Sequence, residues 1–242
     1  MNGMFLAILA QSMLLFGTHA GFNQPGGSAA SSEHLERVST EIVQKSINLK
    51  PGGLILLDTE IGNISVEEFD GRDVKIELTL RGTPDGISNF HFTHNFFGNQ
   101  LTLKGWYEKG EPAGGRALNQ VDFVVRIPKA SHYSLRAVTK QGSIHAAVSG
   151  NMKEVELFTE AGSVKLDLPS NLSANIDAST SDLGKVMINP TSVFSVICPN
   201  CEIRQDDHLK ARMNGGGPSI TAYSGIGNVR VEITSKEGGS RS

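Results

Sequence analysis

Cys198 and Cys201 are the only cysteines in the chain, and they stand close together in the segment ICPNCEIRQDDH. A Cys-x-x-Cys pair could act as a redox dithiol, but in a thioredoxin-type site the motif opens a helix, whereas strand patterns flank it here. A zinc site needs four ligands, and His208 would supply only a third. In an exported protein the simplest prediction is a small disulfide between the two sulfurs, with a thiol-based sensor as an alternative.

Two further polar groups could do chemistry. His91 and His94 are three residues apart, and on a strand they would face opposite sides, so joint metal ligation is not expected. Asp206, Asp207 and His208 could serve acid–base catalysis, but a solvated turn is the favoured interpretation. Neither group therefore predicts a catalytic or a metal-binding residue.

A carbohydrate-active enzyme would need carboxylates from neighbouring strands about 5–9 Å apart. Asp167, Asp182 and Asp206 are the group that this hypothesis requires to converge. The chain has no Gly-x-Ser-x-Gly nucleophile elbow, and its glycine-rich segment NGGGPS lacks the lysine of a phosphate-binding loop. We therefore predict no catalytic residue, no cofactor and no metal.

Aromatic side chains gather between residues 90 and 107. Trp106 and Tyr107 lie near Phe96 and Phe97 in the sequence, and exposed rings of this kind could stack on sugar rings. Burial in the end of the domain is the favoured interpretation, because large aromatic side chains contribute mostly to cores.

The elements that must position these residues follow from a recurring pattern: Thr or Ser, two variable residues, Gly, and then alternating apolar residues. Gly142, Gly162 and Gly184 are 20 and 22 residues apart. Gly227 follows 43 residues after Gly184, about two further steps, and Gly62 precedes Gly142 by 80 residues, about four steps. The five copies are 59–66, 139–146, 159–166, 181–188 and 224–231.

Each copy predicts a corner followed by a half-buried strand. Glycine accepts a positive φ without a Cβ clash, so the five glycines are interpreted as structural turn positions. In SVKLDL (163–168) the apolar side chains share one face and the charged ones the other. A fixed step of 20–22 residues is typical of a β-solenoid, and we expect Ile144, Val164 and Val186 to stack in an internal ladder.

The two ends of such a stack need covers. Alternation and turn signals in 46–82 predict a meander of three or four strands at the N-terminal end. Further strands are expected at 90–93, 100–106 and 120–127, whereas part of 32–47 could instead form an amphipathic helix.

Together these features resemble a known family, the bacterial putative-adhesin β-repeat proteins of unknown function, also called toast-rack domains. The resemblance rests on LKPGGLILLDTEIGNISVEEFDGRDVKIELTLRG, on VDFVVRIPKASHYSLRAVTKQGSI and on the later TxxGxV repeats, and it covers about residues 44–234. It implies an all-β, right-handed β-solenoid of the single-stranded type at the cell surface or in the periplasm, without established catalytic residues. The segment YEKGEPAGGRALNQ and the cysteine segment depart from the family pattern.

The N-terminal sequence MNGMFLAILAQSMLLFGTHA predicts export. An apolar run too short for a comfortable membrane span precedes small residues, which indicates a signal peptide at 1–20 cleaved after Ala20. An uncleaved membrane anchor is the alternative. We expect a flexible leader at 21–42, the β-solenoid domain at 43–234, a disordered tail at 235–242, and a mature form that does not span the membrane.

Composition narrows the class of protein further. A net charge of −3 over 242 residues provides no basic field for nucleic acid, and 27 glycines with 6% aromatic residues suit a turn-rich β protein. We therefore expect a non-catalytic, adhesin-like scaffold that is periplasmic, cell-surface or secreted, with a surface glycan or an envelope protein as partner. A carbohydrate-active β-helix enzyme and a thiol-based envelope sensor are the alternative functions.

Overall fold

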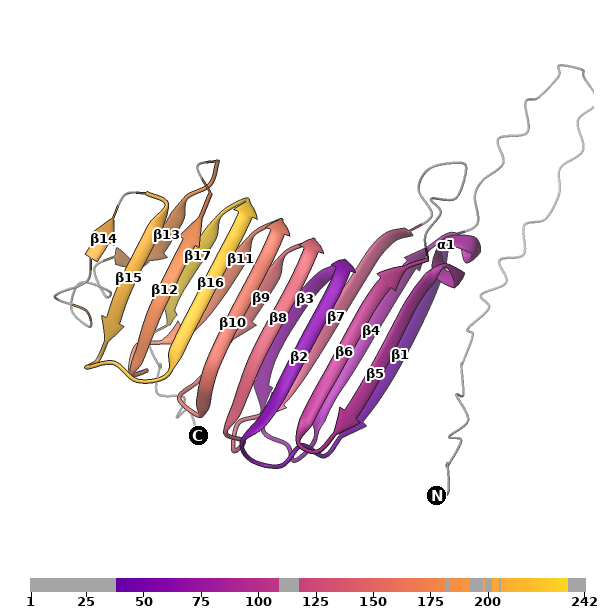
Figure 1. Ribbon diagram of the computed structural model, residues 1–242, viewed down its shortest axis with the longest axis horizontal. Helices are drawn as coiled ribbons and strands as arrows, with labels where there is room; N and C mark the ends of the chain where they lie inside the picture. The colour runs from indigo at the N-terminus through magenta and orange to yellow at the C-terminus, as the bar shows by residue number, and fades with distance from the viewer. Residues whose placement is uncertain are drawn as a thin grey trace, which may run out of the picture.

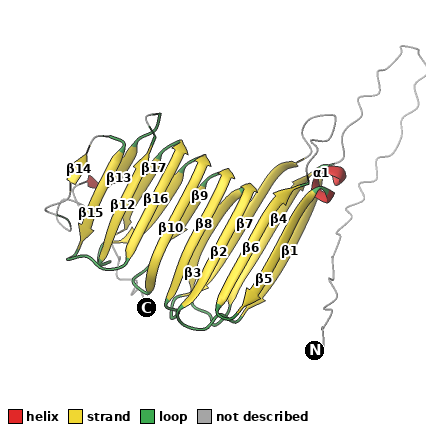
Figure 2. Cartoon of the chain, viewed as in Figure 1, coloured by secondary structure: helices red, strands yellow, loops and turns green. Residues whose placement is uncertain are grey.

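The chain folds into two β-sheets that face each other (Figure 1). Strands make up nearly all of the described secondary structure, and helix α1 (Pro84–Ser88) is a short link between two strands (Figure 2). The prediction of an all-β protein is therefore confirmed. The computed structural model describes residues 38–108, 118–181, 183–191, 198, 202–204 and 206–234.

The strand order differs from the chain order in both sheets. The nine-stranded sheet contains, in spatial order, β5 (Phe90–Phe97), β6 (Gln100–Tyr107), β2 (Gly53–Ile61), β8 (Tyr133–Gln141), β10 (Met152–Ala161), β16 (Ser219–Ile226), β12 (Ala174–Thr180), β15 (His208–Met213) and β14 (Glu202–Arg204). The eight-stranded sheet contains β1 (Ser39–Ile47), β4 (Val74–Gly82), β7 (Leu118–Pro128), β3 (Asn63–Phe69), β9 (Ile144–Ala147), β11 (Val164–Pro169), β17 (Val229–Thr234) and β13 (Val186–Asn189).

Five pairs of consecutive strands share one arrangement, and we call each pair a coil: β2–β3, β8–β9, β10–β11, β12–β13 and β16–β17. The first strand of a coil lies in the nine-stranded sheet, the chain turns at a corner glycine, and the second strand lies in the eight-stranded sheet. Neighbouring coils pair in parallel in both sheets. Strands β6 and β7 extend this stack, because they run parallel to β2 and β3.

The coils do not stack in chain order. Val164 pairs with Ile144 on one side, as the sequence predicts, but its partner on the other side is Val229. Val186 also pairs with Val229, so the expected contact between Val164 and Val186 is wrong. The coil β16–β17 lies between β10–β11 and β12–β13, although it follows both in the chain (Figure 1).

The long gaps between repeats also have a different origin from the one that counting suggests. Ile64 pairs directly with Ile144, so the 80 residues between Gly62 and Gly142 do not form intermediate coils between these two corners. Between β3 and β8 they form β4–β7, which lie on the outer side of the coil β2–β3. The 43 residues between Gly184 and Gly227 likewise include β14 and β15, which pair antiparallel beyond β12.

The N-terminal end is not closed by the meander predicted for 46–82. Strands β2 and β3 belong to different sheets, because the N–H of Gly62 donates to the carbonyl oxygen of Gln141 in the next coil, at 2.8 Å, rather than across a hairpin. The antiparallel pairs β1–β4 and β5–β6 lie at this end instead. Strand β1 replaces the alternative helix, and it begins at Ser39, four residues before the predicted start of the domain.

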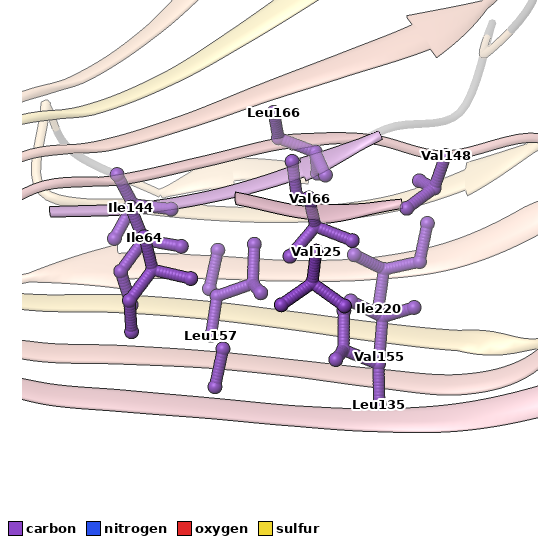
Figure 3. Packing of buried hydrophobic residues seen from close by; sticks show 14 of the residues in the cluster. Ile64, Val66, Val125, Leu135, Ile144, Val148, Val155, Leu157, Leu166 and Ile220 are labelled. Atoms are coloured by element: carbon purple, nitrogen blue, oxygen red, sulfur yellow. The ribbon is translucent and has the colours of Figure 1, made fainter. Parts of the chain in front are cut away.

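The core lies between the two sheets, where inward-facing side chains of both sheets meet (Figure 3). Ile144 and Val164 have no exposed surface, and Ile64 beside Ile144 is 1% exposed. Each such side chain stabilises the fold by about 1.5–3 kcal/mol through burial. Because strand residues alternate between faces, the same strands present polar and charged side chains on the two outer faces.

Candidate functional site

The Thr-x-x-Gly motif forms hydrogen bonds that run from coil to coil. The Thr159 hydroxyl donates to the Gly142 carbonyl oxygen at 2.7 Å, and the Ser224 hydroxyl donates to that of Gly162 at 2.7 Å. Thr139 makes the equivalent bond to Gly62 at 3.1 Å. In the fourth copy the bond to Gly227, at 2.7 Å, is made by Thr180, the residue directly before the predicted Ser181. These buried hydroxyls satisfy corner carbonyls at which the sheet ladder is interrupted, so the motif holds the stack together.

The corner glycines are required for close approach as well as for dihedral freedom. Gly62, Gly142, Gly162 and Gly227 have positive φ. A Cβ at Gly142, Gly162 or Gly227 would overlap the carbonyl oxygen of the preceding corner in the stack. At Gly184 no positive φ occurs, yet a Cβ there would overlap the Gly227 carbonyl oxygen. Each corner therefore packs its backbone directly against the next one.

Of the cysteine segment, the described residues Cys198 and His208 contact different groups. Cys198 is buried, and its Sγ lies 3.4 Å from the carbonyl oxygen of Arg212. Cys201 lies outside the described residues, so the predicted Cys198–Cys201 disulfide stays a prediction. His208 contacts a different group, because its Nε2 lies 2.9 Å from Oδ1 of Asp177.

The two histidines of the edge strand β5 have separate environments. His91 Nε2 lies 3.3 Å from Oε2 of Glu108, and the His91 ring packs against Trp106 with centroids 5.6 Å apart. The pKa of His94 is lowered, first by partial burial and then by the positive charge of Lys45. Within the described residues, no group of three or more His, Cys, Asp or Glu side chains is arranged to hold a metal ion.

The carboxylates required by the enzyme hypothesis do not converge. Asp167 lies on the outer face of the eight-stranded sheet, level with Asn189 of β13, whereas Asp206 accepts a backbone hydrogen bond from Val186. With strands ~4.8 Å apart and ~3.3 Å per residue, two strands and three positions separate Asp167 by about 14 Å from Val186, the residue to which Asp206 is bonded. Asp182 lies outside the described residues.

Glu232, which the sequence reasoning did not consider, is the acidic residue that pairs with Asp167 across β11 and β17. Each of these side chains is 21% exposed. Asp167 Oδ2 lies 2.6 Å from His145 Nε2, and Lys165 Nζ lies 3.0 Å from Oδ1. Asn189 donates to Glu232 Oε2 at 3.0 Å. Both carboxylates are thus engaged by neighbouring polar groups on a flat sheet face.

The aromatic residues near the N-terminal end are mostly exposed, which contradicts the expectation of burial. Phe97 is 84% exposed, and Phe96 and Trp106 also lie on the surface. Tyr107 is half-buried and packs edge-on against Phe90, with centroids 5.8 Å apart. Strand β5 is the last strand of its sheet and pairs only with β6, and its residues from Thr93 to Phe97 are all exposed.

A second aromatic group lies near the middle of the nine-stranded sheet, and the sequence reasoning missed it. Phe158 on β10 and Tyr223 on β16 are register partners, and their rings stack with centroids 4.9 Å apart and 16° between the planes. Phe158 is 38% exposed, and Tyr223 is half-buried. A signal was present: each residue directly precedes the Thr or Ser of a corner motif, and the alternation places that position on the outer face.

Polar residues surround the aromatic pair. Ser179 of β12 is the register partner of Tyr223, and His208 is in turn the partner of Ser179. One pleat along the same strands, Asp177 lies between His208 at 2.9 Å and Lys210, whose Nζ is 3.6 Å from Oδ2. On the other side of the pair, the same pleat carries an ion pair between Arg136 and Glu156.

A shallow hollow continues from these polar residues along the same sheet face. It has a volume of about 460 Å³ and is bordered by the polar side chains Asn175, Asp177, Lys210, Arg212 and Ser219. The aromatic pair, Asp177 and the hollow thus form one continuous surface on β10, β16, β12 and β15, and we call it the aromatic face.

These observations define the class of protein: an all-β chain of two facing sheets whose parallel coils are joined by close-packed glycine corners. No helix among the described residues is long and apolar enough to cross a membrane.

Similarity to known proteins is found among solved structures. No protein-family model and no curated protein sequence matches the chain. A solved structure of a putative cell adhesion protein from Clostridium sporogenes is similar at a TM-score of 0.55 and 10% identity, and the match covers 82% of this chain and 100% of that chain. A putative adhesin from Bacteroides fragilis matches at a TM-score of 0.36 and 13% identity, covering 80% of this chain and 97% of that one. The similarity to the Clostridium sporogenes structure confirms the predicted resemblance to adhesin-like proteins for the fold.

Proposed function

We propose that the protein is an exported, non-catalytic, adhesin-like scaffold of the cell envelope, and that its stacked coils form a right-handed β-solenoid. The observation that carries this proposal is the stack itself. Its interior is filled by apolar side chains, and its two broad outer faces remain available for contact. A rigid surface of this kind suits binding, because little conformational entropy is lost when a partner docks.

The similar structure from Clostridium sporogenes is that of a putative cell adhesion protein, and this supports an adhesive role. The surroundings of the acidic residues Asp167 and Glu232 also favour a scaffold over an enzyme. Asp167 and Glu232 are neighbours on a flat face, but Lys165 and His145 contact the first, and Asn189 contacts the second. A retaining or inverting glycosidase needs one carboxylic acid that is available to protonate the leaving group.

The export part of the proposal can be tested with the N-terminal segment alone. Residues 1–20 fused to a phosphatase reporter that is active only outside the cytoplasm should give an active, secreted or envelope-associated enzyme. A matched fusion in which Leu14 and Leu15 are replaced by Arg should be inactive. A reporter that stays cytoplasmic with the natural segment would contradict export.

The scaffold part can be tested by incubating the purified protein with glycans, peptidoglycan fragments and host matrix proteins. Retention of at least one of these without any cleavage product is expected. Turnover of a glycan that disappears in an Asp167→Asn, Glu232→Gln double variant would establish the enzyme alternative instead. For the sensor alternative, alkylation and mass spectrometry under mild reductant should find no reactive thiol at residue 198 or 201.

A further inference from the structure

The aromatic face carries a chemistry that a scaffold does not need for its own stability. Phe158 and Tyr223 present their stacked rings to solvent from a sheet whose opposite face is already buried in the core. Aromatic rings are amphipathic in a useful way, because their faces pack against C–H groups while polar neighbours remain hydrated. A ligand that matches this surface must have one apolar face and many hydroxyl groups, and sugar rings have both.

Polar neighbours continue from the aromatic pair along the same sheet face. Along β16, Thr221 and then Ser219 follow Tyr223 on the same face, at intervals of about 7 Å set by two residues of strand rise. Beside them, Asp177 accepts hydrogen bonds, and Lys210 and Arg212 donate them. A ring hydroxyl can both donate to a carboxylate and accept from a cation, so this combination suits hydroxyl recognition.

The charges at the border of the hollow favour an acidic sugar. Lys210 and Arg212 contribute two positive charges to its border, and Asp177 contributes one negative charge. The Arg212 Nε donates to the Gly215 carbonyl oxygen at 2.7 Å, which fixes the guanidinium beside the hollow. A sugar that carries a carboxylate would therefore be favoured over a neutral sugar at this position.

We propose that the aromatic face is an oligosaccharide-binding site, in which one sugar ring packs on the side of Tyr223 that points away from Phe158, above Ser179 of β12, and the adjoining unit occupies the hollow beside Asp177, Lys210 and Arg212. This inference rests on the proposed scaffold function and names the class of ligand that the scaffold holds. Backbone N–H and C=O groups of β16 and β12 are already paired within the sheet, so recognition uses side chains alone.

The test is titration calorimetry of the purified protein with three hexasaccharides: β-1,4-linked glucose, β-1,4-linked N-acetylglucosamine and α-1,4-linked galacturonic acid. The natural protein should bind at least one, with the galacturonate oligomer bound most tightly. Phe158→Ala and Tyr223→Ala should each weaken that binding tenfold or more. Lys210→Met should weaken galacturonate binding and leave the neutral oligomers within twofold.

Phe97→Ala is the matched control, because Phe97 is an exposed aromatic residue on the same sheet but lies on β5, five strands from β16. It should change affinity by less than twofold. Thermal unfolding of every variant separates a lost contact from a lost fold, and Tyr223→Phe should retain most of the affinity because it keeps the ring.

Three results would overturn the inference: no binding to any of the three oligomers, unchanged binding in both alanine variants, or an equal loss in Phe97→Ala. If any of these results is found and the protein nevertheless binds an envelope or matrix protein, the proposed scaffold function remains supported and the saccharide site is ruled out. If the natural protein cleaves one of the oligomers, the scaffold function itself fails.

Discussion

Replacement of Gly162 by alanine tests the physical basis of the stack most directly. Gly162 lies at the corner between β10 and β11 with a φ of +150°. The methyl group of alanine would overlap the carbonyl oxygen of Gly142, and the next nearest group is the backbone nitrogen of Ser143 at 3.1 Å. All of these neighbours are backbone atoms, so no flexible side chain can move aside to make room.

The expected loss of stability has two parts. Holding a non-glycine residue at this φ costs about 1–3 kcal/mol. Relief of the overlap must separate two corners, which weakens the Thr159 bond to Gly142 and adds about 1 kcal/mol for the hydrogen bond. The sum predicts that Gly162→Ala lowers the free energy of unfolding by about 2–4 kcal/mol.

Urea unfolding followed by far-ultraviolet circular dichroism measures this quantity. Gly150→Ala is the matched control, because its Cβ would meet only Leu172 Cδ1 at 4.0 Å and its φ is not in the positive region. That variant should be neutral or more stable by up to about 1 kcal/mol, since alanine restricts the unfolded chain. The reasoning is refuted if Gly162→Ala lowers the free energy of unfolding by less than about 1 kcal/mol, or if both variants lower it by the same amount.

Two further predictions follow from the strand order and from a buried phenol. Val164→Ala and Val229→Ala should couple by at least about 0.5 kcal/mol in a double-mutant cycle. Val164→Ala and Val186→Ala should couple less strongly, because the two side chains are about two strand spacings apart and share only Val229 as a neighbour. Stronger coupling between Val164 and Val186 than between Val164 and Val229 would favour stacking in chain order. Burial, and then Glu68, whose Oε1 is 2.7 Å from the hydroxyl, raise the pKa of Tyr133. An unfolded tyrosine loses its proton near pH 10, whereas the buried Tyr133 keeps it. Above pH 10 the free energy of unfolding of the natural protein should therefore fall by about 1.4 kcal/mol per pH unit relative to that of Tyr133→Phe. Parallel pH profiles of the two free energies would contradict this.

The repeating unit could be predicted from the sequence because its chemistry is local. A hydroxyl residue, a glycine three positions later and an alternating run identify the corner at Thr159–Val164 without any knowledge of its neighbours. The strands expected at 90–93, 100–106 and 120–127 were found for the same reason, as parts of β5, β6 and β7. Alternation also fixes which side chains face the core, and Val164 and Ile144 pair as expected.

The order of the coils could not be predicted, because every coil offers its neighbours the same row of backbone donors and acceptors. The residues around Val186 contain no feature that favours Val229 over Val164 as its pairing partner. The aromatic face was missed for a related reason: Phe158 and Tyr223 are 65 residues apart in the chain and meet only because β16 lies beside β10.

The position of the coil β16–β17 has a consequence for biosynthesis. The ribosome synthesises the chain from its N-terminus, so the position between the coils β10–β11 and β12–β13 stays unfilled until residues 219–234 have been synthesised. Vectorial folding can thus complete the layers from β1 to β11, but it must pause there with two unpaired strand edges. A premature stop near residue 215 would remove an internal coil of the stack rather than a coil at its end. The unpaired strand edges of the neighbouring coils would then make such a fragment prone to aggregation.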